Sequence, residues 1–206
     1  MKIYDVPGLP NPLRVRVALS EKGMTDLVEF VPVDVIGGEH REPDFLAKNP
    51  SGVVPVLEFD DGRTLSECSA ITEYLDHADG NPVLTGTTAK ARGEIAMQQR
   101  KAEADVLDAV GAYFHHATPG LGPDLETDQN KAYGEAQRQR AEDAFARFNS
   151  LLESRDYLAG DAFSVADITL AAGLGFADFA KIEIPAHLTA LHDWRARVTS
   201  RPSFAA

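Results

Sequence analysis

Two short stretches of the sequence place backbone polar groups where a small acidic molecule can bind. Pro55 stands at the entry to the apolar, β-branched run 53–59, where its missing N–H is tolerated. A cis Val54-Pro55 bond would turn the N–H and C=O of Val54 outward, so that an extended peptide could pair with them. Glu67 and Cys68 stand at an expected helix start, where free N–H groups and the positive dipole end attract a carboxylate. Together the two features suit a small acidic peptide, although an entry proline and a helix cap are each ordinary structural features when taken alone.

The elements that would position these residues are a hairpin and a helix that follows it directly. Residues 53–59 are expected to form the first strand, and Asp-Asp-Gly at 60–62 is a turn signal. Residues 63–65 can pair back as a short second strand. Small and acidic residues at 66–69 then indicate a helix start, and apolar residues at helical spacing continue to Leu75.

The pattern of this segment resembles one known family. Residues 49–57 read NPSGVVPVL and residues 65–75 read LSECSAITEYL, which is similar to the glutathione-binding half of the soluble glutathione S-transferases. In that family the residue before a cis-proline binds the cysteinyl backbone of glutathione, and a Glu-Ser pair after the hairpin binds its γ-glutamyl end. The usual serine is a cysteine here, which keeps the backbone N–H of that contact and loses the hydroxyl. The resemblance therefore assigns glutathione binding to Val54, Pro55, Glu67 and Cys68.

Glutathione chemistry needs the thiolate, and in this family the loop after the first strand supplies the hydrogen-bond donor. A free thiol titrates near about 8.5, and lowering that pKa by about two units takes roughly 2.7 kcal/mol. Many bacterial relatives read SPNP in this loop, whereas residues 9–12 read LPNP, and Leu9 donates nothing. Asn11 is therefore the catalytic candidate, through its side-chain NH₂ and the free N–H groups of the helix start. The alternative is that Asn11 only caps its helix, with Pro12 as the first helical residue.

Two further residues allow both a functional and a structural interpretation. His40, in Gly38-Glu39-His40, resembles a GEH segment in which some family members bind the glycine carboxylate of glutathione. A single histidine on a loop otherwise faces solvent. Cys68 at a helix N-terminus would have a lowered pKa and could form a mixed disulfide with glutathione. Alternatively it is a small buried residue.

The resemblance also implies a second-substrate pocket over the thiol, between the first-strand loop and the first helices of a helical domain. Leu9 would make its mouth more apolar, which favours a small hydrophobic electrophile. Aromatic residues at helical spacing also occur as ordinary core residues. The residues expected to line the pocket are Leu9, Arg100, Tyr113, Phe114 and His116.

Composition narrows the classes of protein that the chain can belong to. Its 206 residues are enough for one sizeable domain or two small ones. The formal net charge of −12 argues against nucleic acid as a partner, because binding to phosphate backbones needs a basic surface. The single cysteine cannot form an intrachain disulfide, the N-terminus has no apolar signal-peptide core, and no apolar run could span a membrane. We therefore expect a cytoplasmic protein that binds neither nucleic acid nor membrane.

The N-terminal part predicts a thioredoxin-like βαβαββα domain, an α/β fold. Residues 2–6 and 27–35 are expected to be parallel strands joined by a helix that ends at Gly23, and Pro32 favours an edge position for the second strand. Residues 39–46 allow one or two helical turns before the hairpin. The chain lacks the Cys-x-x-Cys of a thioredoxin, so dithiol exchange is not expected.

The C-terminal part predicts an all-helical bundle. Turn residues concentrate just before residue 88, so the expected organisation is a domain at 1–78, a linker at 79–88 and a helical domain at 89–206. Long helices are expected at 89–116, with Met97 on the buried face, at about 129–154 and at 186–199. Ser164 and Asp167 form an expected capping box, which matches the FSxAD segment of the family's helical domain, and we give Asp167 a structural role.

The function expected from these residues and from the resemblance is transfer of the glutathione thiolate to a small hydrophobic electrophile. Glutathione would be the co-substrate, no metal is expected, and family likeness implies a homodimer. One alternative is a glutathione-dependent reductase of peroxides or disulfides. Another is a glutathione-binding or interaction protein with little catalysis, because Leu9 removes the usual side-chain donor.

Overall fold

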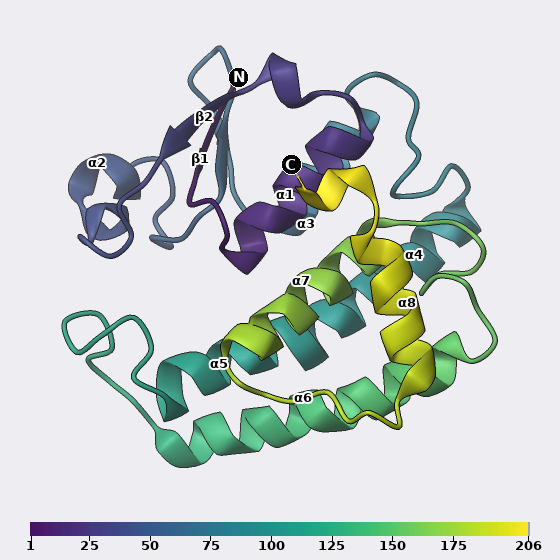
Figure 1. Ribbon diagram of the computed structural model, residues 1–206. Coiled ribbons are helices and arrows are strands. Elements are labelled where there is room, and N and C mark those ends of the chain that lie inside the picture. The colour runs from purple at the N-terminus through teal and green to yellow at the C-terminus, as the bar shows by residue number, and fades with distance from the viewer. Residues whose placement is uncertain (206) are drawn as a thin grey trace. The chain divides into compact units, whose positions relative to one another are not determined.

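The computed structural model describes residues 1–205, and the chain divides into two units (Figure 1). The first unit comprises Met1–Pro82 together with residues 203–205, and the second comprises Val83–Pro202. The division falls in the turn-rich stretch between the helices Cys68–His77 and Ala89–Ala102. The first unit therefore contains all the residues that the sequence assigns to glutathione.

The N-terminal unit is built on a mixed four-stranded sheet of order β2-β1-β3-β4. β1 pairs parallel with β2 and antiparallel with β3, and β3 pairs antiparallel with β4. Pro32 ends β2 at the edge of the sheet, as predicted, where its missing N–H interrupts no central ladder. The strands are β1 (Lys2–Asp5), β2 (Glu29–Pro32), β3 (Val56–Glu58) and β4 (Thr64–Leu65).

Helices cover both faces of this sheet because the strand side chains alternate between them. Ile3 and Leu57 point to one face and form a core with α1 (Pro10–Glu21) and α3 (Cys68–His77). Val56 points to the other face and packs with Phe45 of the short α2 (Pro43–Leu46). Together with the 3₁₀ turns Thr25–Leu27 and Glu39–Arg41, this arrangement confirms the predicted thioredoxin-like fold.

The start of α1 differs from the prediction. The helix begins at Pro10, its N-cap is Leu9, and no side chain caps it. Asn11 is therefore the second helical residue, and the prediction that it is the N-cap was wrong. Proline suits the first helical position because its fixed φ is already helical and no N–H partner is needed there, so Pro10 extends the helix by two residues.

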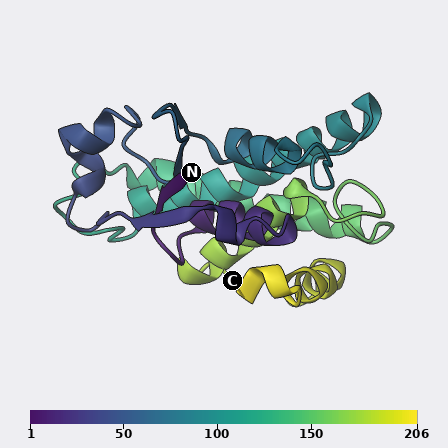
Figure 2. The same ribbon diagram turned by 90° about the horizontal axis from the view of Figure 1, so that it is seen from above.

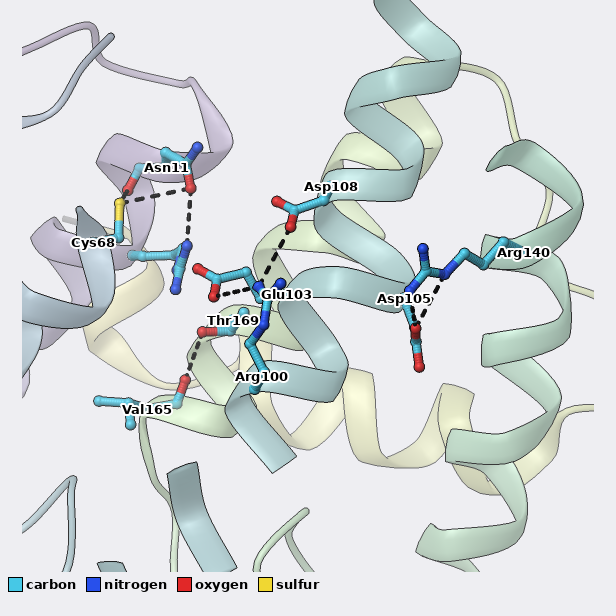
Figure 3. Close-up of polar contacts among 10 residues, drawn as sticks. Asn11, Cys68, Arg100, Glu103, Asp105, Asp108, Arg140, Val165 and Thr169 are labelled. Atoms are coloured by element: carbon cyan, nitrogen blue, oxygen red, sulfur yellow. Dashed lines mark hydrogen bonds and ion pairs between the residues drawn. The ribbon is translucent and has the colours of Figure 1, made fainter. Parts of the chain in front are cut away.

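The C-terminal unit is all-helical, as predicted, but its first long helix is not uniform. A π-helical segment, Glu103–Leu107, joins α4 to α5, and Met97 is 46% exposed, so the prediction that it faces the core was wrong. Asp105 of this segment binds Arg140 of α6 at 2.7 Å (Figure 3) and Arg147 of the same helix at 3.3 Å. The helices are α4 (Ala89–Ala102), α5 (Asp108–Ala117), α6 (Lys131–Leu152), α7 (Val165–Phe179) and α8 (Thr189–Thr199), followed by the 3₁₀ turn Pro202–Ala205.

α7 is the central helix of this unit. Figure 2 shows it between α4 and α8, and most of its residues are buried. Its capping box is formed as predicted, because Asp167 accepts the Ser164 N–H and the Ser164 hydroxyl accepts the Ala166 N–H. Asp167 also accepts hydrogen bonds from the Trp194 indole and the Leu158 N–H, both at 3.0 Å. Burial raises the pKa of Asp167, and these hydrogen bonds act in the opposite direction.

None of the helices in the described part of the chain is both long and apolar enough to cross a bilayer.

Candidate functional site

The loop before α1 brings few hydrogen-bond donors to the helix start. Pro10 and Pro12 have no N–H, and the N–H of Leu13 already donates to the C=O of Leu9 at 3.0 Å. Of the first three residues of α1, only Asn11 therefore has an N–H, and no acceptor for it is found among residues 1–205. The positive end of the helix dipole thus presents a single backbone donor.

The side chain of Asn11 lies between α1 and the start of α3 (Figure 3). Its Oδ1 accepts a hydrogen bond from Nη1 of Arg14 at 3.0 Å, and the single S–H of Cys68 is shared between the Asn11 C=O at 3.4 Å and Oδ1 at 3.6 Å. No acceptor for the side-chain NH₂ is found within residues 1–205. Because the side chain makes no cap hydrogen bond, the alternative in which Asn11 only caps its helix was wrong.

The entry to β3 leaves one backbone pair open. The Val54-Pro55 bond is cis, as predicted. Asn49 Nδ2 donates to the C=O of Val53 at 2.8 Å and holds the approach to this bond. The N–H and C=O of Val54 have no hydrogen-bond partner in the described part of the chain. An extended peptide bound alongside could supply hydrogen-bond partners for both groups.

The start of α3 presents a carboxylate and unpaired N–H groups. Glu67, the N-cap, has φ 69° and ψ 117°, a backbone conformation that is unfavourable for a residue with a side chain. Its carboxylate is exposed and has no partner among residues 1–205, so it is available for an ammonium group. The N–H groups of Ser69 and Ala70 also lack acceptors there, since the first helical bond is donated by Ile71.

Cys68 is buried, with 6% of its surface exposed, and its thiol is directed at Asn11. This agrees with the interpretation of Cys68 as a small buried residue, and it places the sulfur beside the start of α1.

His40 lies in the 3₁₀ turn Glu39–Arg41 and is only 8% exposed, so the solvent-facing alternative was wrong. The turn packs against Gly52, where an added Cβ would lie 3.1 Å from the C=O of His40. Burial and, to a smaller extent, the neighbouring Arg41 cation lower the pKa of His40. Its Nδ1 is buried and has no hydrogen-bond partner within the described residues, which is uncommon unless a ligand or water completes it.

The residues expected to line the second-substrate pocket have separate partners. Leu9 lies in the N-terminal unit, at the start of α1. In the C-terminal unit, Arg100 forms ion pairs with Glu103 (3.3 Å) and Asp108 (3.6 Å) beside the π-helical segment (Figure 3). The guanidinium of Arg138 lies 5.7 Å from the ring centroid of Tyr113.

Phe114 and His116 lie near the C-terminal end of α5. Phe114 is buried against Phe176 and Phe179 of α7, with ring centroids 5.5 and 5.6 Å apart. Nδ1 of His116 accepts the Asn130 N–H at 3.1 Å, which places the proton of a neutral ring on Nε2. Phe179 is 66% exposed and is not among the residues predicted to line the pocket. The signal was available, because Phe176 and Phe179 are three residues apart on one helix.

Sequence reasoning also missed Arg14, which is only 2% exposed on the buried face of α1. An arginine is almost never fully buried without a partner. Its spacing of three residues from Asn11 puts the two side chains on the same helix face, and that spacing could have revealed the pair.

No group of three or more His, Cys, Asp or Glu side chains that could hold a metal ion is found in residues 1–205.

Comparisons with known proteins agree with this arrangement. The family model of the glutathione S-transferase N-terminal domain matches residues 10–78, and that of the C-terminal domain matches residues 94–202. Glutathione S-transferase 2 of Saccharomyces cerevisiae is 52% identical over 203 residues, which cover 98% of this chain and 87% of the relative.

Solved structures are similar over nearly the whole chain. A glutathione S-transferase domain-containing protein of Marinobacter aquaeolei is 60% identical, with a TM-score of 0.97 and coverage of 98% of this chain and 99% of the other. The crystal structure of Gtt2 from Saccharomyces cerevisiae also gives a TM-score of 0.97, at 52% identity and with 98% of each chain covered. The chain belongs to the glutathione S-transferase family.

Proposed function

We propose that the chain binds glutathione in its N-terminal unit and transfers the thiolate to a small hydrophobic electrophile. The observation that carries the proposal is the pair of N–H donors on Asn11, one from the backbone and one from the side chain, at a helix start with no other donor in its first three residues. These donors have no internal acceptor in the described chain, and a thiolate is an acceptor that would fit them.

The binding half of the proposal uses four groups of the same unit. The peptide of the cysteinyl residue pairs with Val54, while the γ-glutamyl ammonium meets Glu67 and its carboxylate meets the N–H groups at the start of α3. His40 binds the glycine carboxylate, which would give its buried Nδ1 a hydrogen-bond partner. Because a carboxylate favours the protonated imidazole, this contact would raise the pKa that burial lowers.

The chemical half needs the thiol ionised near neutral pH. A hydrogen bond to a charged group contributes about 1.5–3 kcal/mol, so the two donors of Asn11 can supply the roughly 2.7 kcal/mol that a two-unit drop in thiol pKa requires. The thiolate then attacks the electrophilic carbon, the S–C bond forms, and the leaving group departs with its electron pair. A hydrophobic electrophile is favoured because Leu9 contributes an apolar side chain beside Asn11.

The test follows ionisation of bound glutathione by the ultraviolet absorbance of its thiolate, together with the rate of aryl halide conjugation. In Asn11→Ala the backbone N–H remains and only the side-chain donor is lost, so the thiol pKa of bound glutathione should rise by about one unit and turnover near neutral pH should fall about tenfold. The melting temperature should fall because Arg14 loses its hydrogen bond to Oδ1, although no helix cap is removed, so the thiol pKa carries the test.

Asn81→Ala is the matched control, because Asn81 is exposed and lies at the end of the same unit. It should alter neither the thiol pKa nor turnover. Binding of glutathione without turnover of any aryl halide would contradict the transferase proposal and favour a binding protein. Turnover of hydroperoxide alone would favour the reductase. The proposed homodimer is tested separately by sedimentation of the whole chain.

A further inference from the structure

The buried arginine of α1 is connected to the group that we assign to catalysis. Arg14 lies one helical turn after Asn11 and is 2% exposed, and its Nη1 donates to Asn11 Oδ1 at 3.0 Å. A buried guanidinium is costly unless its hydrogen bonds are made in good geometry. The hydrogen bond from Nη1 to Oδ1 is therefore favoured to persist, and it holds the Asn11 side chain in one orientation.

The chemistry of the guanidinium decides which end of the amide faces it. Arginine has only N–H donors, so the atom of Asn11 that faces Nη1 must be the oxygen. A half-turn of the amide would bring NH₂ donors against an N–H donor and lose the charge-assisted hydrogen bond. The thiol of Cys68 donates to the same oxygen at 3.6 Å and favours the same orientation.

We propose that Arg14 is a positioning residue for the transferase reaction, with Cys68 in support. It holds Oδ1 of Asn11 toward the protein and so leaves Nδ2 to donate to the sulfur of glutathione. The inference rests on the proposed function. It explains how the asparagine at position 11 can replace the serine hydroxyl that relatives use as the donor to the thiolate. An asparagine can present either an acceptor or a donor to the sulfur, and only the donor stabilises the thiolate.

The charge on Arg14 also strengthens the hydrogen bond that the Asn11 NH₂ donates to the thiolate. A hydrogen bond to the oxygen of an amide polarises its N–H bonds and strengthens their donation. A serine introduced at position 68 would also carry a donor for Oδ1. The Cys68→Ser variant should therefore retain the orientation, whereas Cys68→Ala removes only the weaker of the two donors.

The test measures the thiol pKa of bound glutathione in Arg14→Met, in Asn11→Ala and in the double variant. Arg14→Met removes the donor and keeps an unbranched side chain of similar length. The thiol pKa should rise by about one unit, and turnover near neutral pH should fall about tenfold with the KM for glutathione little changed. Activity should recover above the raised pKa, which loss of packing alone would not produce.

The double variant separates action through Asn11 from any direct action of Arg14. If Arg14 acts through the amide, Arg14→Met should produce no further rise in thiol pKa when Asn11 is already alanine. An equal rise in both backgrounds would overturn the inference. Arg16→Lys is the matched control, because Arg16 lies on the same helix and pairs with Asp5 at 2.7 Å instead.

A measurement on the unaltered chain keeps the inference testable if Arg14→Met fails to fold. The side-chain ¹⁵NH₂ resonances of Asn11 should titrate with the thiol of bound glutathione and should not titrate with S-methylglutathione. Resonances that do not respond to the thiol would overturn the orientation. If Asn11→Ala leaves the thiol pKa unchanged, the proposed function fails, whereas a rise in Asn11→Ala without one in Arg14→Met refutes only the role of Arg14.

Discussion

The starts of α1 and α7 solve the same physical problem in opposite ways. Every helix begins with N–H groups that have no helical partner. At α7, the Ser164 hydroxyl accepts the N–H of Ala166 and the Asp167 carboxylate accepts the N–H of Ser164. Both residues are almost fully buried. At α1, two prolines remove donors, no side chain caps the helix, and the N–H of Asn11 stays open.

The difference distinguishes polar groups that hold the fold from polar groups reserved for a ligand. Asp167 accepts hydrogen bonds from Leu158, Ser164 and Trp194, so its removal affects several elements at once. The oxygens of Asn11 are held by Arg14 and Cys68, but its N–H donors and the Glu67 carboxylate have no partner in the described chain, so losing these groups should affect binding and catalysis. Four predictions test this distinction, from the largest expected effect to the smallest.

Asp167→Ala should lower the free energy of unfolding by about 4 kcal/mol or more, because it leaves the buried N–H groups of Leu158, Ser164 and Trp194 without an acceptor. Denaturant unfolding measures the change. Asp178→Ala on the same helix removes an exposed ion pair with Arg195 and should cost less than about 1 kcal/mol. Equal losses of stability in the two variants would contradict the role of Asp167 as the shared acceptor of these three N–H groups.

Glu67→Gly should weaken glutathione binding about tenfold or more and at the same time stabilise the fold by roughly 1 kcal/mol. The first effect follows from loss of the carboxylate, and the second from relief of the positive φ. Calorimetry and thermal unfolding measure the two effects. Lys181→Gly is matched in backbone, since Lys181 has φ 63°, and it should stabilise the fold without changing glutathione affinity.

Ser164→Ala should cost about 1 kcal/mol of stability, the usual worth of an N-cap, with the thiol pKa of bound glutathione unchanged. Asn130→Ala, which removes the cap of α6, should cost a similar amount. The comparison would break if either variant changed the thiol pKa of bound glutathione, because a cap that serves the fold would then also act on the ligand.

The smallest effect concerns the pH dependence of His40. Because burial lowers the pKa of His40 in the folded chain, the unfolded chain binds more protons once the pH falls below its ordinary value of about 6.5. Stability should therefore be constant above that pH and decrease as the pH falls toward the lowered pKa. Urea unfolding at a series of pH values measures this effect as the slope of the free energy of unfolding against pH.

His40→Asn should remove this part of the slope, whereas His187→Asn, at an exposed position, should leave it in place. Saturating glutathione should also reduce the slope, because a bound carboxylate gives the imidazolium a partner. An unchanged slope with glutathione bound would argue against His40 as the group that holds the glycine end.

Local sequence signals were sufficient for much of the fold. The Asp-Asp-Gly turn, the edge proline Pro32 and the Ser164 capping box depend on a few adjacent residues, and the structure confirms all three. The start of α1 was misplaced because Pro10 and Pro12 both suit a first helical position. Neighbouring residues alone could not choose between them.

The candidate site was predicted less completely, because its organisation depends on tertiary contacts. The burial of Arg14 and of His40 results from packing against distant residues, which composition and spacing do not specify. The contact of Cys68 with Asn11 joins positions 57 residues apart. Motif resemblance pointed to segments of the chain, but not to which atoms of those segments remain without partners.

The π-helical segment Glu103–Leu107 has a consequence for how related sequences are aligned. Each residue of a regular α-helix turns the chain by about 100°, whereas a π-helical turn closes its hydrogen bond over five residues instead of four, so the segment takes in an extra residue while α5 keeps its orientation. Deleting a single residue between 103 and 107 should therefore leave a regular helix with the same α5 side chains pointing inward. Counting helical periodicity from α4 without allowing for the extra residue would assign the α5 residues to the wrong faces.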